Sequence, residues 1–197
     1  KLRMAFIGAG GIAGTHMRYL AEMDDVALVA LADISEDAMA GRAAEFGIDA
    51  AFTDYRKMLR EVKPDAVSVC TPNGMHARAS IAASTAGADV LVEKPMAMNA
   101  REAQGMIDAA KKSHRKLVIG FQHRYDPRTQ FVRNAVEAGQ LGKVVYARVQ
   151  ALRRRGIPNW GVFGRKDLQG GGPLIDIGVH ALEMTHYAMG SPRPVAA

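Results

Sequence analysis

Cysteine is almost absent from this chain of 197 residues, since Cys70 is the only one. A single thiol excludes an intramolecular disulfide and gives no sign of an oxidising compartment. Long apolar runs are absent too: none approaches the roughly 18 residues of a membrane-spanning helix, and the first residues lack a signal-peptide pattern. We therefore expect a cytoplasmic protein with no membrane partner, in which Cys70 is a small buried hydrophobic residue rather than a nucleophile.

Aromatic residues are also few, at 6% of the chain, and none is interleaved with the two basic runs, Lys111–Lys116 and Arg153–Arg155. The net charge is +6, but basic surfaces that bind nucleic acid carry a recognisable motif or aromatic residues as well. We therefore expect no nucleic-acid partner. The arginine run predicts a solvated face, or alternatively a region that attracts an anionic substrate.

Glycine, by contrast, is plentiful at 20 residues, and the first of them form a functional pattern. Gly8, Gly10 and Ala13 make G-x-G-x-x-A between an apolar strand and a helix, which is the context that dinucleotide binding requires. Gly8 permits a tight turn, Gly10 lets the backbone approach a pyrophosphate, and Ala13 lets the helix pack close to the strand. Gly11 and Ile12 open the helix, whose unpaired N–H groups attract phosphate.

Asp33 ends the second predicted strand, 20 positions after Ala13. An acid at that distance can accept hydrogen bonds from the ribose hydroxyls of adenosine. Glu36 and Asp37 follow, and no basic residue occurs until Arg42, so a 2′-phosphate would meet negative charge without a bidentate partner. The sequence thus favours NAD over NADP, although Glu36 and Asp37 also suit the first turn of a helix.

Apolar strands and helical segments alternate along the first part of the chain. This alternation predicts an α/β fold, a Rossmann-type doubly wound parallel sheet, and an NAD-binding domain over residues 1–121. The expected strands are 2–7, 26–32, 51–53, 66–70, 89–92 and 117–121, and the expected helices are 11–23, 35–46, 54–61, one ending at 86, and 99–113.

Lys94 stands directly after the fifth expected strand, in Glu93-Lys94-Pro95. The carboxyl ends of parallel strands border the crevice in which open α/β sheets bind ligands, so a lysine there is placed for chemistry. Taken alone, Lys94 is equally well an exposed lysine at the end of a strand.

A second group of polar residues lies near the end of the chain, after three glycines. Pro173 suits the first turn of a helix, on which Asp176 and His180 are four residues apart and share a face. Asp176 can orient an imidazole or hold a substrate hydroxyl, and His180 is suited to proton transfer near neutral pH. A metal site through His180, Glu183 and His186 is the weaker alternative, because no other ligand cluster completes it.

Four motifs in one order give the chain a family resemblance that spans essentially all of its residues. The chain resembles the Gfo/Idh/MocA oxidoreductases in Gly8-x-Gly10-x-x-Ala13, Thr71-Pro72-Asn73-x-x-His76, Glu93-Lys94-Pro95, and Gly171-Gly172 followed by Asp176-x-Gly178-x-His180.

This resemblance implies an enzyme that moves a hydride between NAD and a CH–OH carbon of a sugar, a polyol or a related compound. It also implies that Lys94, Asp176 and His180 meet at the nicotinamide end of the cleft, and that Arg124 faces the substrate together with Asp176 and His180. The residues that it places along the cofactor, besides the glycine loop and Asp33, are Thr71, Pro72, Asn73, His76, Glu93 and Lys94.

Residues 122–197 are expected to begin an α+β substrate and oligomerisation domain with a mostly antiparallel open sheet. Lys143–Arg153 predicts its first strand, and Pro173–Met189 predicts its helix. One strand cannot form a stable sheet, and the chain lacks an initiating methionine, so we expect a fragment of a longer protein that forms a homo-oligomer.

The resulting hypothesis is an NAD-dependent dehydrogenase in which His180 is the main acid and base and Lys94 polarises the reacting oxygen, or the reverse. Two alternatives remain, because a fold alone does not settle chemistry. The first is an NAD-dependent redox-assisted lyase or glycosidase, which would regenerate its cofactor without net formation of NADH. The second is a non-catalytic NAD-binding regulator, against which the joint presence of Lys94, Asp176 and His180 argues.

Overall fold

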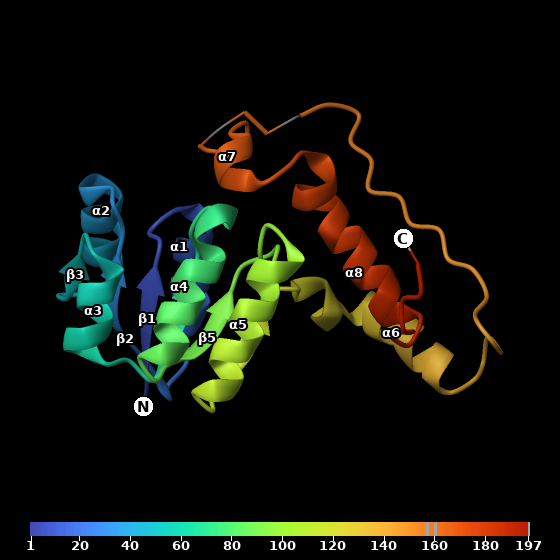
Figure 1. Ribbon diagram of the computed structural model, residues 1–197, viewed down its shortest axis with the longest axis horizontal. Helices are drawn as coiled ribbons and strands as arrows, with labels where there is room; N and C mark the ends of the chain where they lie inside the picture. The colour runs from blue at the N-terminus through green and yellow to red at the C-terminus, as the bar shows by residue number, and fades with distance from the viewer. Residues whose placement is uncertain (157, 160, 197) are drawn as a thin grey trace. The chain divides into compact units, whose positions relative to one another are not determined.

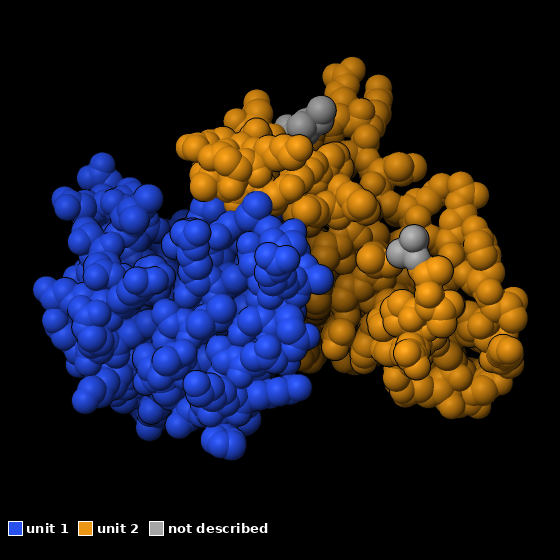
Figure 2. All heavy atoms as spheres, in the orientation of Figure 1, with its two compact units in different colours: residues 1–120 blue, residues 121–197 orange. Residues whose placement is uncertain are grey.

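The computed structural model describes residues 1–156, 158–159 and 161–196. The chain divides into unit 1, Lys1–Gly120, and unit 2, Phe121–Ala197, which are coloured separately in Figure 2. Within the described residues, no helix combines the length and the apolar character needed to cross a membrane.

Unit 1 is built on a six-stranded parallel sheet with the strand order β3-β2-β1-β4-β5-β6 (Figure 1). The chain moves outward from the central strand β1 in one direction, and then through β4 in the other, as in doubly wound dinucleotide-binding sheets. The predicted α/β, Rossmann-type fold is thus confirmed. The strands are β1 (Leu2–Ile7), β2 (Val26–Ala32), β3 (Ala51–Phe52), β4 (Ala66–Val69), β5 (Asp89–Val92) and β6 (Leu117–Ile119), and the helices are α1 (Gly11–Ala21), α2 (Glu36–Phe46), α3 (Tyr55–Val62), α4 (Asn73–Thr85) and α5 (Ala100–Lys112).

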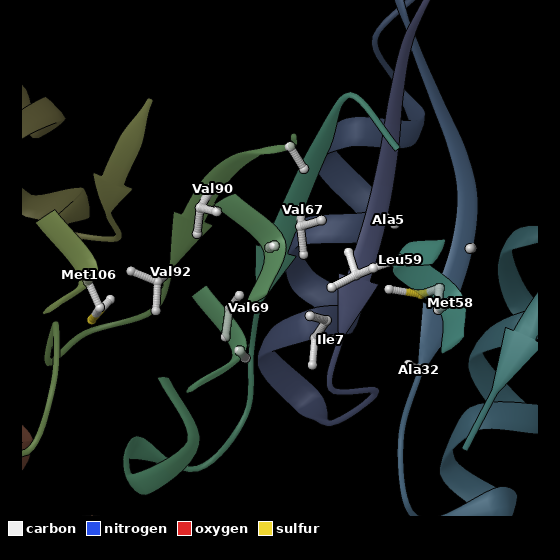
Figure 3. Packing of buried hydrophobic residues seen from close by; sticks show 14 of the residues in the cluster. Ala5, Ile7, Ala32, Met58, Leu59, Val67, Val69, Val90, Val92 and Met106 are labelled. Atoms are coloured by element: carbon white, nitrogen blue, oxygen red, sulfur yellow. The ribbon is translucent and has the colours of Figure 1, made fainter. Parts of the chain in front are cut away.

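Successive strand residues point to opposite sides of this sheet, so each strand contributes apolar side chains to both faces. Helices cover both faces and bury these side chains. On one face, Ile7 and Val69 belong to the same buried cluster as Met58 of α3 and Met106 of α5 (Figure 3). On the other face, Phe6 belongs to a second cluster with residues of α1 and α2. Burying a side chain of this size stabilises the fold by about 1.5–3 kcal/mol relative to leaving it exposed.

The five helices of unit 1 begin in two different ways. In α2, α3 and α5, the side chains of Ser35, Asp54 and Asn99 accept hydrogen bonds from backbone N–H groups of the first turn. In α1 and α4, which start after Gly10 and Pro72, no described side chain caps the helix. At the start of α1, the first N–H groups therefore remain available to an external acceptor.

Unit 2 contains helices α6 (Pro127–Glu137), α7 (Lys166–Gln169) and α8 (Val179–Ala188), together with the short turns η1 (Gln122–Tyr125) and η2 (Leu174–Gly178). The helix expected from Pro173 is present, but it begins with a π-helical turn, η2. Helix α6 is absent from the sequence-based expectations, although Asp126 caps it and Pro127 occupies its first turn.

The predicted strand over Lys143–Arg153 is wrong, because these residues have no regular secondary structure. A strand is defined by hydrogen bonds to a neighbouring strand. The described residues of unit 2 contain no strand with which this segment can pair.

Candidate functional site

The carboxyl ends of the central strands meet at one edge of the sheet. The ends are in register, with Ile7 paired to both Ala32 and Val69, and Val69 paired to Val92. The predicted cofactor residues Gly8, Asp33 and Glu93 directly follow β1, β2 and β5, and Thr71 stands two residues after the end of β4. Sequence positions up to 85 residues apart are thereby collected along the edge at which α/β sheets bind ligands.

The glycine loop has the shape that a dinucleotide requires. Gly8 has a φ of +102°, and a Cβ atom at this position would lie 2.5 Å from the carbonyl oxygen of Cys70. Only glycine fits there without strain. At Gly10 and Gly11, by contrast, a Cβ atom would meet nothing within 4 Å. The loop is therefore packed tightly at Gly8 against Cys70, just after β4, and is open at Gly10 and Gly11, beside the uncapped start of α1, so the residues present fit a pyrophosphate.

Asp33 is oriented by two backbone hydrogen bonds. Its Oδ2 accepts a hydrogen bond of 2.6 Å from the N–H of Ala9, and its Oδ1 accepts one of 2.8 Å from the N–H of Ser35. The carboxylate thus joins the end of β2 to the glycine loop. Each oxygen keeps a further acceptor position, which is what the hydroxyls of a ribose need.

Arg42 lies closer to this loop than its position in the sequence suggests. Its Nε donates a hydrogen bond of 3.4 Å to the carbonyl oxygen of Ala9, and its guanidinium group forms an ion pair with Glu45. The guanidinium also lies against Gly14, where a Cβ atom would be 2.4 Å from its Cζ atom. The charge of Arg42 is thus balanced by Glu45, beside the loop.

His76 connects two loops at the same edge. Its ring is buried, with Nδ1 at 2.7 Å from the carbonyl oxygen of Pro95 and Nε2 at 2.9 Å from that of Thr71. Burial lowers the pKa of His76 and outweighs the two carbonyl groups, which favour the charged ring. Thr71, Pro72 and Asn73 lead into α4, and His76 contacts the carbonyl oxygen of Thr71 from within that helix.

His16 is a residue that the sequence-based reasoning missed. From α1 its ring reaches β4 and β5, with Nδ1 at 2.9 Å from Ser68 Oγ and Nε2 at 3.0 Å from Glu93 Oε1. Hydrogen bonds with Cys70 and Glu93 raise the pKa of His16 to about 10. Burial alone would raise the pKa of Glu93, but the hydrogen bond and positive charge of His16 outweigh it and hold that pKa below its usual value.

Lys94 follows Glu93 and is half-buried. Its backbone N–H donates a hydrogen bond of 3.1 Å to Glu93 Oε2, and the Lys94–Pro95 peptide bond is cis. Lys94 lies just beyond the end of β5, at the edge that carries the glycine loop.

Asp176 and His180 lie together in unit 2, Asp176 in the π-helical turn η2 and His180 in the first turn of α8. π-helical turns inside helices occur frequently at functional sites. The ring of His123, from η1, meets that of His180 edge to face, with 5.0 Å between the ring centroids and an interplanar angle of 84°. His123 is a second residue that the sequence-based reasoning did not identify.

Arg124 is held by other residues of unit 2. It forms an ion pair with Glu183 and lies over the ring of Tyr187, 5.2 Å from its centroid. His186 is hydrogen-bonded to the carbonyl oxygen of Pro192 at 2.8 Å. Two residues of the alternative metal site therefore have other partners, and the described side chains include no cluster of three or more that could hold a metal ion.

Comparison with known proteins identifies two family models in the chain. The model described as "Oxidoreductase family, NAD-binding Rossmann fold" matches residues 2–121. The model of the GFO/IDH/MocA C-terminal domain matches residues 129–197. Together they cover most of both units.

Two curated relatives are dehydrogenases of sugars or polyols. D-glucoside 3-dehydrogenase of Escherichia coli is 43% identical over 192 residues, which are 97% of this chain and 55% of the relative. Myo-inositol 2-dehydrogenase of Thermotoga maritima is 31% identical over 189 residues, again 55% of the relative. The chain thus spans about half the length of the curated relatives it matches.

A solved structure extends the comparison to a bound cofactor. GenD2 from gentamicin A biosynthesis, in complex with NAD, is 26% identical, with a TM-score of 0.86 over 98% of this chain and 54% of that protein. A probable dehydrogenase from Thermotoga maritima is 30% identical, with a TM-score of 0.82 over 96% of this chain and 55% of that protein.

Proposed function

Because the chain belongs to the oxidoreductase family with the NAD-binding Rossmann fold, we propose that it acts as an NAD-dependent dehydrogenase on a CH–OH group of a sugar, a polyol or a related compound. The relatives named above act on a glucoside and on an inositol. The observation that carries the proposal is the glycine loop. It is closed against Cys70, open above and joined to Asp33, at the edge of the sheet that also bears Lys94.

Unit 1 holds the cofactor in this proposal. Gly10, Gly11, Ile12 and Ala13 present the open start of α1 to the pyrophosphate, and Asp33 accepts hydrogen bonds from the adenosine ribose. Thr71, Pro72 and Asn73 line the path toward the nicotinamide. His76 contributes through its contacts with Thr71 and Pro95, because both of its ring nitrogens face backbone carbonyl oxygens.

When bound, NAD would be the oxidant that accepts a hydride from the substrate carbon. The residues of the chain manage the proton and the oxygen. His180 takes the hydroxyl proton as the carbonyl group forms, and Lys94 donates a hydrogen bond to the same oxygen and stabilises its developing negative charge. Asp176 orients the imidazole or holds a neighbouring substrate hydroxyl. In the reverse reaction, His180 returns the proton.

Unit 2 is part of the substrate and oligomerisation domain in this proposal, with residues 1–121 as the cofactor domain. Arg124 contributes to the substrate side through its guanidinium group, which Glu183 and Tyr187 hold in place. The assembly is a homo-oligomer and the compartment is the cytoplasm. The match of the GFO/IDH/MocA C-terminal domain model to residues 129–197 supports the assignment of unit 2 to the substrate domain.

The test has two stages, so that binding and chemistry are judged separately. First, calorimetric titration with NAD and NADP measures cofactor affinity, and NAD is expected to bind more tightly. Second, a panel of glucosides, inositols and simple alcohols is screened with NAD for the absorbance of NADH. NAD could bind tightly while no alcohol yields NADH and a substrate is cleaved. That result would favour the redox-assisted lyase or glycosidase over the dehydrogenase. Absence of NAD binding would remove the proposal.

A further inference from the structure

A half-buried ion pair connects the glycine-loop helix to the segment that carries Lys94. His16 lies on α1, and its Nε2 donates to Glu93 Oε1 over 3.0 Å. The second oxygen of Glu93 accepts the backbone N–H of Lys94 over 3.1 Å. Two consecutive hydrogen bonds therefore run from the helix that starts at the loop to the backbone of Lys94.

The surroundings fix the carboxylate of Glu93 in one place. The exposed fractions of the His16 and Glu93 side chains are only 18% and 14%. Gly120 lies against the carboxylate, because a Cβ atom at that position would be 3.1 Å from Oε1. On the other side of the imidazole, Nδ1 lies 2.9 Å from Ser68 Oγ and 3.7 Å from Cys70 Sγ. Neither partner can turn away without losing several contacts at once.

His76 holds the same segment from its other end. Its ring contacts the carbonyl oxygen of Pro95, the residue after Lys94, and that of Thr71 at the start of α4. The backbone at Lys94 is thus held between Glu93 and Pro95 by two histidines from two helices. If the pair of His16 and Glu93 served only to stabilise the fold, it would not need to include a hydrogen bond to the backbone of Lys94.

We propose that His16 is a positioning residue, which acts through Glu93 to fix Lys94 relative to the helix that binds the pyrophosphate. The inference rests on the proposed function, since it concerns the lysine and the helix named there. Its consequence is coupling: when α1 is fixed by NAD, the backbone and ammonium group of Lys94 are fixed with it. Loss of the pair weakens the effect of NAD on Lys94, and by reciprocity it changes NAD affinity by no more than the factor by which that effect falls.

The experiment measures Lys94 directly and does not require turnover. Lys94 is labelled with acetic anhydride under competitive conditions, and its rate constant is read by mass spectrometry with and without saturating NAD. NAD affinity is measured by calorimetry on the same preparations. The variants are His16→Gln, Glu93→Gln and the double variant, and the matched control is His114→Gln, an exposed histidine of unit 1.

In the unsubstituted chain and in His114→Gln, NAD is expected to slow the labelling of Lys94 by about tenfold, the scale of an ordinary coupling between sites. In His16→Gln, Glu93→Gln and the double variant, the slowing is expected to fall to about twofold, without additivity between the two substitutions, because they break one connection. By reciprocity, the NAD affinity of His16→Gln is expected to fall by no more than about fivefold, the factor by which the slowing falls.

Three results would overturn the inference. The first is tenfold slowing in folded His16→Gln or folded Glu93→Gln. The second is additive effects in the double variant, and the third is loss of folding in both single variants, judged by circular dichroism, which would reduce the pair to a stability element. Failure of the unsubstituted chain to bind NAD would instead refute the proposed function, and calorimetry reports that separately.

Discussion

Units 1 and 2 of this chain are organised in opposite ways. In unit 1, fully buried strand residues lie on both faces of a continuous sheet, with Phe6 and Leu31 in one cluster and Val67 and Val92 in the other. Among the described residues of unit 2, the only buried one is Thr129, whereas Phe131 of α6 is 73% exposed and Leu182 of α8 is 67% exposed. Unit 1 is thus held by its own core, whereas the described part of unit 2 buries little apolar surface by itself.

Amide hydrogen exchange is expected to show the largest contrast between the two units. Amides of β1 and β4 exchange only when the sheet opens, whereas residues 143–153 have no regular secondary structure to protect them. We expect exchange in the central strands to be slower by about a thousandfold or more, since core protection approaches the global stability. Mass spectrometry of peptic fragments measures it. Similar protection in both places would show that unit 2 has a core of its own in solution.

The two proposed catalytic residues come from different units, and their removal tests each unit in turn. Lys94→Ala in unit 1 and His180→Ala in unit 2 are each expected to lower kcat by about a hundredfold, the usual scale for a positioned acid or base. NAD affinity should change little, so steady-state kinetics and calorimetry separate the two effects. Lys112→Ala and His114→Ala, two exposed positions of unit 1, are the controls. Near-normal turnover in both catalytic variants would remove these roles.

The order in unit 1 depends on glycines whose roles differ sharply. Gly8→Ala is expected to destabilise the protein by about 3 kcal/mol, because a side chain there is strained and collides with β4. Gly41→Ala, within α2, is the matched control: its Cβ meets nothing within 4 Å, and alanine should stabilise the helix by about 1 kcal/mol. Urea unfolding measures both variants. Equal effects would contradict the tight packing of the loop.

Cofactor choice is expected to depend on unit 1 alone. The double variant Asp33→Ser, Ile34→Arg removes the ribose acceptor and places a guanidinium where Ile34 is 93% exposed. We expect NAD affinity to fall and NADP affinity to rise, each by about tenfold, since one charge-assisted contact is exchanged for another. Asp24→Ser, an exposed acid before the opposite end of β2, is the control for removal of charge. An unchanged preference in calorimetric titrations would show that Asp33 does not select the cofactor.

The smallest expected effect is the pH dependence that His16 gives to the stability of unit 1. Its folded-state pKa, raised to about 10, lies above the ordinary value of 6.5. The contribution of charged His16 to the free energy of unfolding is therefore fully present below pH 6.5 and is lost as the pH rises toward 10. Because the ring is partly solvated, we expect only about 1 kcal/mol. The difference in unfolding free energy between the unsubstituted chain and His16→Gln, measured from pH 6 to 10, should shrink across this window. A constant difference would contradict the charged pair.

The sequence predicted the bounds of β1, β2 and β5 correctly because their information is local. Each is an apolar run that ends at a glycine or a charged residue, and a buried parallel strand needs little more. The strand over Lys143–Arg153 was predicted from the same kind of pattern and is wrong, because strand formation also requires a neighbour. Local pattern was sufficient only where the rest of the sheet was present.

The site residues divide in the same way. Gly8, Gly10 and Asp33 were predicted as cofactor residues from their spacing within one strand–helix–strand unit, which is a local pattern. His16 and Glu93 were not found as a pair, because 77 residues separate them. The one available signal was position: His16 lies between Ala13 and Met17, both fully buried, so a polar ring on that face of α1 needed a polar partner. Which partner it has depends on the strand order, which no local pattern contains.

The contact between Gly8 and the carbonyl group of Cys70 also concerns the order of folding. The fingerprint from Gly8 to Ala13 leaves the ribosome before the carbonyl group of Cys70, which is made 62 residues after Gly8. The central strands β1 and β4 must therefore pair before the loop has the form that receives a pyrophosphate. A nascent chain that ends before β4 thus carries the motif without the backbone against which its turn packs.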